Sequence, residues 1–538
     1  MRVGRAAFPG GVHPPQHKEA ALELRVGQVR LPRRLILPLH QHIGQSAEPV
    51  VEAGQEVLKG QLVAKASGYV SAAIHASSSG RVAAVEDHPV PHPSGLSAPC
   101  VIIETDGRER WVPPPPPVDY TRTDPSHLRN LVREAGIVGL GGAGFPSFIK
   151  LNPGRGRQVE TLILNGVECE PYITCDDALM RERPREILAG AHIMRHALQA
   201  RECVVAVEDN KPGAYEAMRE AAAKEGDIRV VMLPTRYPQG SEKQLIQVIT
   251  GKEVPSNGLP IDVGVVVHNV GTAYAVYRAI RWGEPLVSRV VTVTGGAVRR
   301  PRNLRVPLGT PVVHLLRECG TDFDRIDRLI MGGPMMGIAL HTWDVPVVKT
   351  TNCIIAATAE EMPPPEPPMP CIRCGACMDA CPVGLLPQQL YWYAQARDLE
   401  RVQAYDLFDC IECGCCAYVC PSRIPLVQYY RFAKGAIWAQ ERERQKADLA
   451  RRRHQARQER LEREKRERAE RLRQKKAQAA KAPQEAVRQA VERAQARREE
   501  ARRRAMEQAP KRAQEQARRA RERAGGPPEP PLGPQDED

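Results

Sequence analysis

Two stretches decide the fold of this chain: CIRCGACMDACP (371–382) and CIECGCCAYVCP (410–421). Each has four cysteines in the spacing C-x2-C-x2-C-x3-C, followed by proline. Three closely spaced thiolates suit one iron–sulfur cubane, and the fourth typically binds the neighbouring cluster. We therefore predict two [4Fe–4S] clusters with crossed ligands. One set is Cys371, Cys374, Cys377 and Cys420, and the other is Cys410, Cys413, Cys416 and Cys381.

Structural zinc and disulfides are the alternative roles for these cysteines. Zinc sites usually use two CxxC pairs with a longer gap between them. Disulfides need an oxidising compartment, and the opening MRVGRAAFPGG lacks the apolar core of a signal peptide. The spacing therefore favours clusters. Cys415 falls outside the spacing of the second motif, and we expect it to be a packing residue.

Composition indicates several domains and an uneven charge. The chain has 538 residues and a net charge of +13. Residues 441–538 contain 30 Lys+Arg and 19 Asp+Glu, so +11 of the net charge lies in this tail. The sequence contains no apolar run of about 18 residues, so no transmembrane helix is expected. The tail is predicted to be a solvated helix or disordered, because its strong helix formers carry no heptad of leucines.

The rest of the chain predicts a multidomain α/β protein. Short strands broken by Gly and Ser in VEAGQEVLKGQLVAKASGYVSAAIHASSSGRVAAVE (51–86) favour a small β-domain. Strands expected at 161–167, 202–208, 228–234 and 262–270 alternate with helices, which is typical of a parallel, Rossmann-like sheet. The predicted domains are 1–115 (β), 120–285 (Rossmann-like), 286–350 (β-grasp-like), 365–435 (two-cluster ferredoxin) and the tail 441–538.

A second motif indicates a nucleotide site. In GIVGLGGAGFPSFIKL (136–151), glycines let the backbone approach a ligand closely, and amides at a helix start can bind phosphate. A glycine-rich loop alone could equally be a tight turn. The stretch ILNGVECEPYITCDD (163–177) follows a strand and is expected to place its acidic residues on the loop at the strand's end. Open α/β sheets bind ligands at this position.

These motifs carry a resemblance to a known family. FPGGVHPPQHK (8–18), the two stretches above, GSEKQLI (240–246), VVVHNVGTAYAV (265–276) and the paired cysteine motifs together resemble the C subunit of the Rnf (Rsx) electron transport complex. The match covers residues 1 to about 435. The glycine loop and the acidic stretch are also similar to the flavin- and NADH-binding subunit of complex I. Residues 51–86 resemble the barrel-sandwich fold of biotinyl and lipoyl carriers.

The resemblance implies a function and a cellular location. It implies a peripheral subunit on the cytoplasmic side of a bacterial inner membrane, with the other Rnf subunits as partners. Such a subunit exchanges electrons between NADH and a ferredoxin-type acceptor, coupled to ion transport, and uses non-covalent FMN and the two clusters.

The resemblance also implies roles for individual residues. Glu168 and Glu170 would be catalytic. The residues that would bind the flavin and nucleotide are Gly141, Gly142, Gly144, Lys150, Asn165, Glu242, Asn269 and Thr272. Three residues depart from the complex I pattern: Leu140, Val167 and Ser241 stand where that subunit has arginine, an acidic residue and glutamate.

Two alternatives remain open from the sequence. The chain could be an electron relay whose partners hold all the flavin, with a purely structural glycine loop. The basic tail could contact anionic lipid headgroups, which its charge favours over nucleic acid because it has no interleaved aromatic residues and many acidic ones. We expect no specific nucleic-acid partner.

Overall fold

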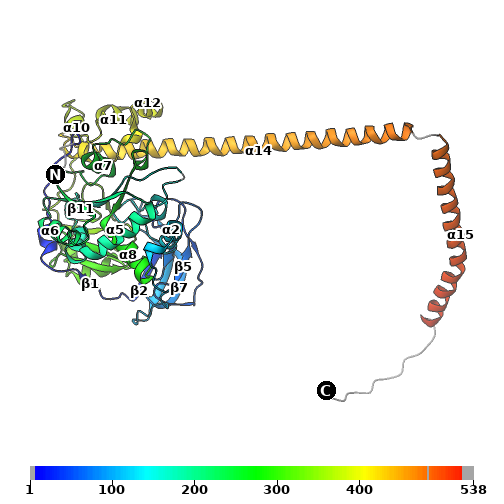
Figure 1. Ribbon diagram of the computed structural model, residues 1–538, viewed down its shortest axis with the longest axis horizontal. Coiled ribbons are helices and arrows are strands. Elements are labelled where there is room, and N and C mark those ends of the chain that lie inside the picture. The colour runs from blue at the N-terminus through cyan, green and yellow to red at the C-terminus, as the bar shows by residue number, and fades with distance from the viewer. Residues whose placement is uncertain (1–6, 155, 482–483, 524–538) are drawn as a thin grey trace, which may run out of the picture. The chain divides into compact units, whose positions relative to one another are not determined.

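The computed structural model describes residues 7–154, 156–481 and 484–523 (Figure 1). The chain divides into two compact units, Met1–Trp438 and Ala439–Asp538. The first unit contains the sheets and both cysteine motifs. Its short 3-10 helices are η1 (Tyr120–Arg122), η2 (Pro260–Val263), η3 (Phe323–Arg325) and η4 (Leu407–Asp409).

Two small antiparallel sheets form the predicted β-domain. One has the order β2 (Arg34–Pro38), β8 (Ser97–Thr105), β7 (Gly80–Pro89) and β4 (Glu56–Val57). The other has the order β3 (Glu48–Pro49), β5 (Leu62–Lys65) and β6 (Ile74–His75). Apolar residues that alternate along β2 and β8, such as Leu35, Leu37 and Ile103, are buried between them. The sequence favoured small β-structure here, and the structure has it, although its buried residues continue into the core of the Rossmann-like domain.

A four-stranded parallel sheet forms the Rossmann-like domain. Its order is β11 (Ile228–Leu233), β10 (Glu202–Glu208), β9 (Thr161–Gly166) and β12 (Val265–Asn269), and all three pairings are parallel. The valine- and leucine-rich strands suit burial on both faces. The helices of this domain are α2 (Pro125–Glu134), α3 (Ser147–Lys150), α4 (Cys175–Glu182), α5 (Pro184–Leu198), α6 (Pro212–Ala222), α7 (Glu242–Thr250) and α8 (Val270–Trp282).

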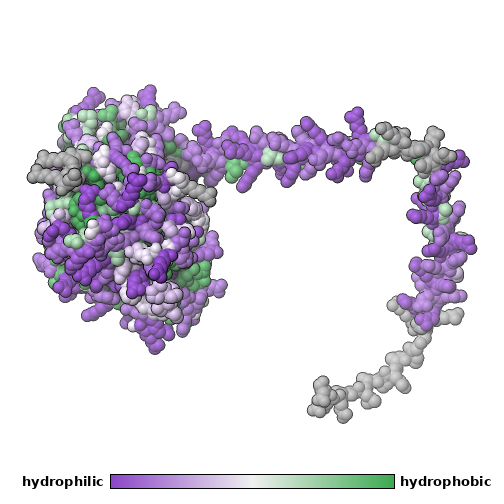
Figure 2. Space-filling model, viewed as in Figure 1, coloured by the Kyte–Doolittle hydropathy of each residue, from purple (hydrophilic) through white to green (hydrophobic). Residues whose placement is uncertain are grey.

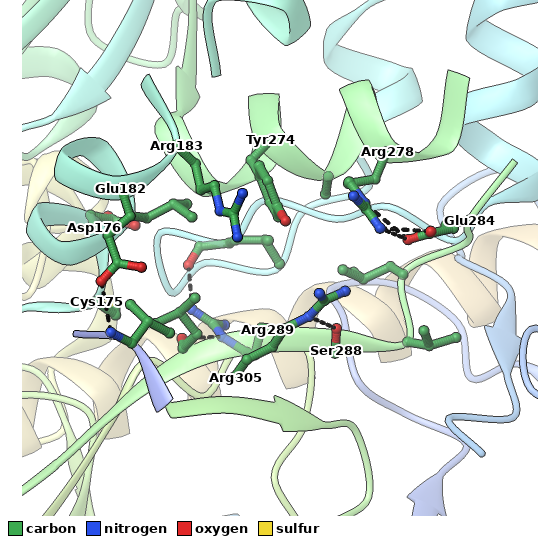
Figure 3. Close-up of a pocket in the computed structure, with 18 of the residues that line it drawn as sticks. Cys175, Asp176, Glu182, Arg183, Tyr274, Arg278, Glu284, Ser288, Arg289 and Arg305 are labelled. Atoms are coloured by element: carbon green, nitrogen blue, oxygen red, sulfur yellow. Dashed lines mark hydrogen bonds and ion pairs between the residues drawn. The ribbon is translucent and has the colours of Figure 1, made fainter. Parts of the chain in front are cut away.

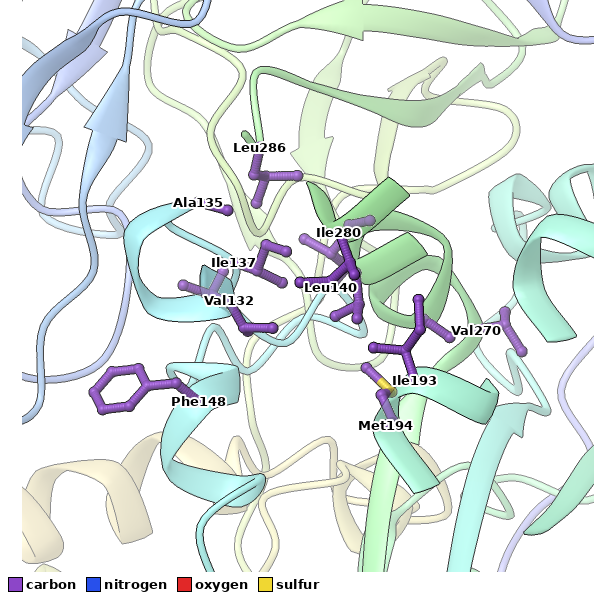
Figure 4. Packing of buried hydrophobic residues seen from close by; sticks show 14 of the residues in the cluster. Val132, Ala135, Ile137, Leu140, Phe148, Ile193, Met194, Val270, Ile280 and Leu286 are labelled. Carbon is purple, nitrogen blue, oxygen red and sulfur yellow. The ribbon is translucent and has the colours of Figure 1, made fainter. Parts of the chain in front are cut away.

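The glycine-rich stretch packs into the core of this domain. Helices α5 and α8 contact each other closely (Figure 1). Ile137 and Leu140, from the glycine-rich stretch, lie against Ile193 of α5 and Val270 of α8 (Figure 4). Ile137 and Leu140 therefore anchor the stretch in the core. Gly141 and Gly142, which follow them, lie outside this apolar cluster and have backbone that a ligand can approach.

A six-stranded mixed sheet follows in the chain. Its order is β1 (Gly27–Gln28), β14 (Arg302–Pro307), β13 (Ser288–Thr294), β17 (Cys353–Ala357), β15 (Arg328–Met331) and β16 (Ile338–Ala339), with α9 (Val312–Glu318) packed in its core. Strand β1 and helix α1 (Glu19–Leu22) come from the segment that we assigned to the first domain. Strand β1 thus pairs with β14 of this sheet, and α1 packs against β13 and β14.

Short helices surround the cysteine motifs. They are α10 (Ala376–Asp379), α11 (Pro387–Gln395), α12 (Leu399–Ala404), α13 (Cys415–Tyr418) and the first turns of α14 (Leu426–Lys481). Gly375 and Gly414 precede α10 and α13 with φ of +83° and +82°, so each motif turns sharply between its second and third cysteines. Glycine adopts this conformation without steric cost.

The tail is helical in its described part. Helix α14 continues past the boundary between the units, and α15 (Gln484–Arg523) follows it. Hydrophilic side chains surround both helices (Figure 2), and nearly all described side chains after residue 438 are exposed. Among the described helices, none combines the length and apolarity needed to cross a membrane.

Candidate functional site

A cavity of about 510 Å³ lies at the carboxyl ends of β9 and β12. Its wall combines the glycine loop (139–144), the acidic loop (168–173), a segment around Gly332 and Gly333, and Cys413 of the second cysteine motif. The volume lies within the range of about 300–1,000 Å³ that is typical of sites for cofactors and small molecules. The position agrees with the general rule for ligands of open α/β sheets.

Six of the ten predicted catalytic and cofactor-binding residues line this cavity. They are Gly141, Gly142, Asn165, Glu168, Glu170 and Asn269. The other four, Gly144, Lys150, Glu242 and Thr272, do not line it. Their individual roles in ligand binding stay predictions.

The glycine loop opens its backbone to the cavity. Gly142 has a φ of +111°, and a Cβ at this position would find no atom within 4 Å. Gly144, at φ +65°, is needed for packing, since a Cβ there would lie 2.6 Å from Cγ2 of Thr350. Thr272 Oγ1 accepts a 2.9 Å hydrogen bond from the Leu140 amide, so it fixes the loop from behind.

Lys150 and Glu242 form an ion pair with each other. Nζ of Lys150 lies 2.5 Å from Oε1 of Glu242, joining α3 to α7. The positive charge of Lys150, which we expected to bind the flavin or nucleotide, is therefore neutralised by a carboxylate. The sequence motifs assigned both residues to ligand binding. They gave no sign of this ion pair, because its two residues are 92 positions apart in the chain.

Glu168 caps helix α4. Its two carboxylate oxygens accept hydrogen bonds from the amides of Asp176 (2.7 Å) and Asp177 (3.2 Å). Asp176 and Asp177 therefore belong to the first turn of α4, not to the loop where the sequence pattern placed them. Asn269 Nδ2 donates a 2.6 Å hydrogen bond to Asp176. Burial, followed by the charge of Glu168, raises the pKa of Asp176 to about 7.

Glu170 holds the opposite wall of the cavity. Its carboxylate accepts hydrogen bonds from the amides of Met335 (3.1 Å) and Met336 (2.8 Å). Burial raises the pKa of Glu170 to about 7, although these two amides oppose the shift. A carboxyl group that gains and loses a proton near neutral pH therefore borders the cavity.

The eight motif cysteines gather in two groups of four. Cys371, Cys374, Cys377 and Cys420 line one pocket. Cys381, Cys410, Cys413 and Cys416 line another. Four thiols around one space fit the donor set of a [4Fe–4S] cluster, and the two groups coincide with the crossed sets expected from the spacing. Cys415, by contrast, is fully buried and outside the predicted sets.

The two groups differ in exposure. Cys381, Cys413 and Cys416 are each no more than 8% exposed, and Cys413 also lines the large cavity. Cys374 is exposed to solvent. We call the first group the inner set (Cys381, Cys410, Cys413 and Cys416) and the second the outer set (Cys371, Cys374, Cys377 and Cys420).

Backbone contacts fasten the inner set to the cavity wall. The hydroxyl of Tyr237 donates a 2.7 Å hydrogen bond to the carbonyl of Cys413. The N-terminal strap (residues 8–18) pairs with the backbone of Tyr237 through Val12, and its Gly11 amide donates a 3.0 Å hydrogen bond to Ala380. The strap therefore joins the Rossmann-like domain to the chain just before Cys381.

A second cavity of about 170 Å³ lies behind the glycine loop (Figure 3). Arg289, on its wall, is buried and donates to the carbonyls of Leu140 (3.1 Å) and Lys349. Arg183, Arg278 and Arg305 also border this cavity, and Arg278 is paired with Glu284. Arg289 thus holds the glycine loop through the Leu140 carbonyl and does not itself line the main cavity.

Sequence reasoning missed three side chains that shape the site: Lys18, Tyr237 and Arg289. Lys18 ends the stretch 8–18, but no local pattern gives it a role. Each of them binds a carbonyl about 150 or more positions away in the chain: that of Glu168, Cys413 and Leu140, respectively. No periodicity or spacing marks contacts of this kind.

Comparison with known proteins assigns four parts of the chain. Family models match as the RnfC barrel sandwich hybrid domain (6–108), the Nuo51 FMN-binding domain (132–278), the SLBB domain (290–339) and the 4Fe-4S dicluster domain (370–424). The multidomain α/β fold predicted from the sequence is confirmed. The chain thus has the domain types that bind FMN and two [4Fe–4S] clusters.

Curated relatives cover most of the chain. The C subunit of the ion-translocating oxidoreductase complex of Pseudomonas aeruginosa is 52% identical over 84% of this chain and 58% of its own length. The Rhodobacter capsulatus protein of the same name is 51% identical over 80% of this chain and 82% of its own length. The chain spans less than two thirds of the length of the P. aeruginosa, Erwinia tasmaniensis and Pectobacterium atrosepticum proteins that it matches.

A solved structure also resembles part of the chain. NAD+-reducing [NiFe]-hydrogenase in the H2-reduced state aligns with 55% of this chain and 60% of its own chain, at 19% identity and a TM-score of 0.41. This likeness is too distant to support an inference. The identity and coverage of the curated relatives are sufficient by themselves, and the chain belongs to the family of C subunits of the ion-translocating oxidoreductase complex.

Proposed function

We propose that this chain binds FMN in the main cavity and passes electrons from NADH to two [4Fe–4S] clusters. One observation carries the proposal: Gly142, Glu170 and Cys413 line the same cavity. The glycine loop and a thiol that we expect to bind the inner cluster thus border one space. Bound FMN would supply the change from two-electron hydride chemistry to the one-electron chemistry of the clusters.

The chain's own residues would bind and orient these groups. The open backbone at Gly142 offers amide donors, which favour phosphate or other anionic groups. Asn165 donates a 2.8 Å hydrogen bond to the Gly240 carbonyl, so its side chain is fixed at the wall. Glu170, with a pKa near 7, would hold a proton at its carboxyl group close to the reacting atoms.

The difference in exposure supports an order for the two clusters. The inner set, which shares Cys413 with the cavity, would receive electrons first. The outer set would pass them to a partner. Two large apolar residues beside the outer set support a docking role, since Ile372 is 66% and Trp392 is 42% exposed.

We further infer that the chain acts as a peripheral subunit of an ion-translocating complex at the bacterial inner membrane, on its cytoplasmic side. The name shared by its relatives supports this assignment. The other subunits of the complex and a ferredoxin-type acceptor would then be its partners.

The tail supports a contact with anionic lipid. Its described helices α14 and α15 carry basic side chains exposed to solvent. Each basic residue near an anionic membrane surface contributes roughly 1 kcal/mol. Such a contact would hold the chain at the membrane without a transmembrane helix.

Anaerobic analysis of the purified chain tests the proposal. Iron, sulfide and flavin are measured, and NADH is then added stepwise while the cluster signals are followed by EPR. Stoichiometric FMN and NADH-dependent cluster reduction are expected. Cluster signals that respond to dithionite but not to NADH would reject the NADH role. A chain that binds the clusters but does not bind FMN would instead be an electron relay alone.

A further inference from the structure

Lys18 is a buried cation at the back of the acidic loop. It is only 4% exposed, and it precedes the short helix α1 at the end of the N-terminal strap. No carboxylate forms an ion pair with Lys18 in the part of the chain that the structure describes. A buried ammonium group without such a partner is costly unless its donors are all satisfied.

All three donors of this ammonium group go to one loop. Nζ of Lys18 lies 3.0 Å from the carbonyl oxygen of Glu168, 2.8 Å from that of Glu170 and 2.5 Å from that of Ile173. A lysine ammonium has three N–H groups, so this set of acceptors is complete. The acidic loop therefore wraps its carbonyls around a single positive charge.

The backbone of the acidic loop needs such support. Glu168 and Tyr172 have φ of +46° and +67°, a region that residues with a side chain rarely adopt. Each such residue costs on the order of 1–3 kcal/mol and persists only where the surroundings impose it. The strap supplies a further restraint, because the Gln16 carbonyl accepts a hydrogen bond from the Tyr172 amide (2.8 Å) and the ring of His17 stacks on that of Tyr172 (4.8 Å).

We call the three hydrogen bonds from Lys18 to the acidic loop the clamp. The loop that it holds carries both predicted catalytic carboxylates, Glu168 and Glu170. With its backbone held by Lys18, Glu168 reaches the amides at the start of α4, and Glu170 reaches those of Met335 and Met336. The side chain of Lys18 does not line the cavity. Its effect on a ligand must therefore pass through the loop.

We propose that Lys18 is the positioning residue of the cavity. Its ammonium group draws three carbonyls of the acidic loop away from the ligand and sets the places of Glu168 and Glu170. This role extends to FMN binding and therefore rests, for that part, on the proposed function. The strap is then a component of the ligand site, not only a link between domains.

Lys18→Met tests the clamp, because methionine keeps the length of the side chain and removes its charge and donors. Lys59→Met is the control: the Lys59 side chain is 14% exposed, but it bonds Glu109 and does not line the cavity. Lys18→Arg keeps the charge and several donors. All variants are purified anaerobically and compared well below their melting temperatures, and equal iron content shows that the clusters have assembled.

Hydrogen–deuterium exchange of the acidic loop is the first measurement. We expect Lys18→Met to speed exchange of the 168–173 amides at least about tenfold, since bonds from a charged donor are lost. Lys59→Met should leave them unchanged. Equal exchange in Lys18→Met and wild type, or equal acceleration by Lys59→Met, would overturn the proposal. This measurement needs no flavin, so it decides the clamp even if the wild type binds none.

FMN titration, followed by quenching of flavin fluorescence, is the second measurement. Lys18→Met should weaken FMN binding at least about tenfold, with Lys18→Arg recovering part of the loss. If the wild type binds no FMN, the proposed function is rejected. The clamp is then judged from the hydrogen–deuterium exchange result alone. A wild type and Lys18→Met with the same affinity and the same bound-flavin spectrum would reject the positioning role.

Discussion

Replacing Gly10 by alanine tests whether the N-terminal strap connects the cavity to the inner set. Gly10 has a φ of +61°, and a Cβ there would lie 2.5 Å from the carbonyl oxygen of Cys381. Ordinary contacts begin at 3.4 Å, so the two backbones must separate by about 0.9 Å. The 3.0 Å hydrogen bond from Gly11 to Ala380 would then stretch to about 3.9 Å and be lost.

The magnitude follows from these two effects. An alanine with left-handed φ costs about 1–2 kcal/mol, and the lost hydrogen bond adds about 0.5–1.5 kcal/mol. Gly107→Ala is the matched control, because Gly107 has a φ of +72° and a Cβ there would find no atom within 4 Å. The control should bear only the conformational cost, about 1–2 kcal/mol.

Hydrogen exchange and EPR provide the assay. The amides of Gly11 and Val12 should exchange up to about tenfold faster in Gly10→Ala than in Gly107→Ala. NADH should reduce the clusters more slowly in Gly10→Ala, while dithionite reduces them as in the wild type. Unchanged protection of the strap together with unchanged NADH-dependent reduction would refute the reasoning.

The site and the tail give three further predictions. Burial raises the pKa of Glu170 from 4.5 to about 7, so its stabilising contribution is complete below pH 4.5 and is lost as the pH rises through 7. The melting temperature of the wild type should fall relative to that of Glu170→Gln between roughly pH 4.5 and 7, and parallel curves would contradict this. In Cys374→Ser, NADH should still reduce the inner cluster. In Cys413→Ser, the outer cluster should lose its NADH-dependent reduction. EPR measures both, and an equal loss of NADH-dependent cluster reduction in the two variants would contradict the proposed order. A chain lacking residues 441–538 should be recovered less on anionic vesicles, and recovery equal to the full chain at low salt would exclude the lipid contact.

Regular patterns made much of the fold predictable. The valine-rich run that includes Val204 and Val205, bounded by helical stretches, indicated a buried parallel strand, and the structure places it inside the sheet, between two parallel neighbours. The cysteine spacing likewise predicted which thiols gather, because the short loops leave little freedom. Both patterns involve residues that are close together in the sequence, and the structure keeps the arrangement that each pattern predicts.

Contacts between distant segments could not be predicted in this way. Strand β1 pairs with β14 across more than 270 residues, and nothing in Gly27 or Gln28 indicates the partner. The ion pair of Lys150 with Glu242 and the clamp formed by Lys18 are of the same kind. A charged residue in the sequence shows neither its burial nor the group that neutralises it, so the roles of individual side chains were less predictable than the site as a whole.

The unequal shielding of the two cysteine groups has a consequence for ageing of the protein in air. Oxygen and chelators meet Cys374 at the surface, whereas Cys381, Cys413 and Cys416 are buried. Oxidative damage should therefore begin at the cluster of the outer set and spare the cluster of the inner set. A molecule injured in this way would still accept reducing equivalents but could not hand them on, and it would become a dead end within its assembly.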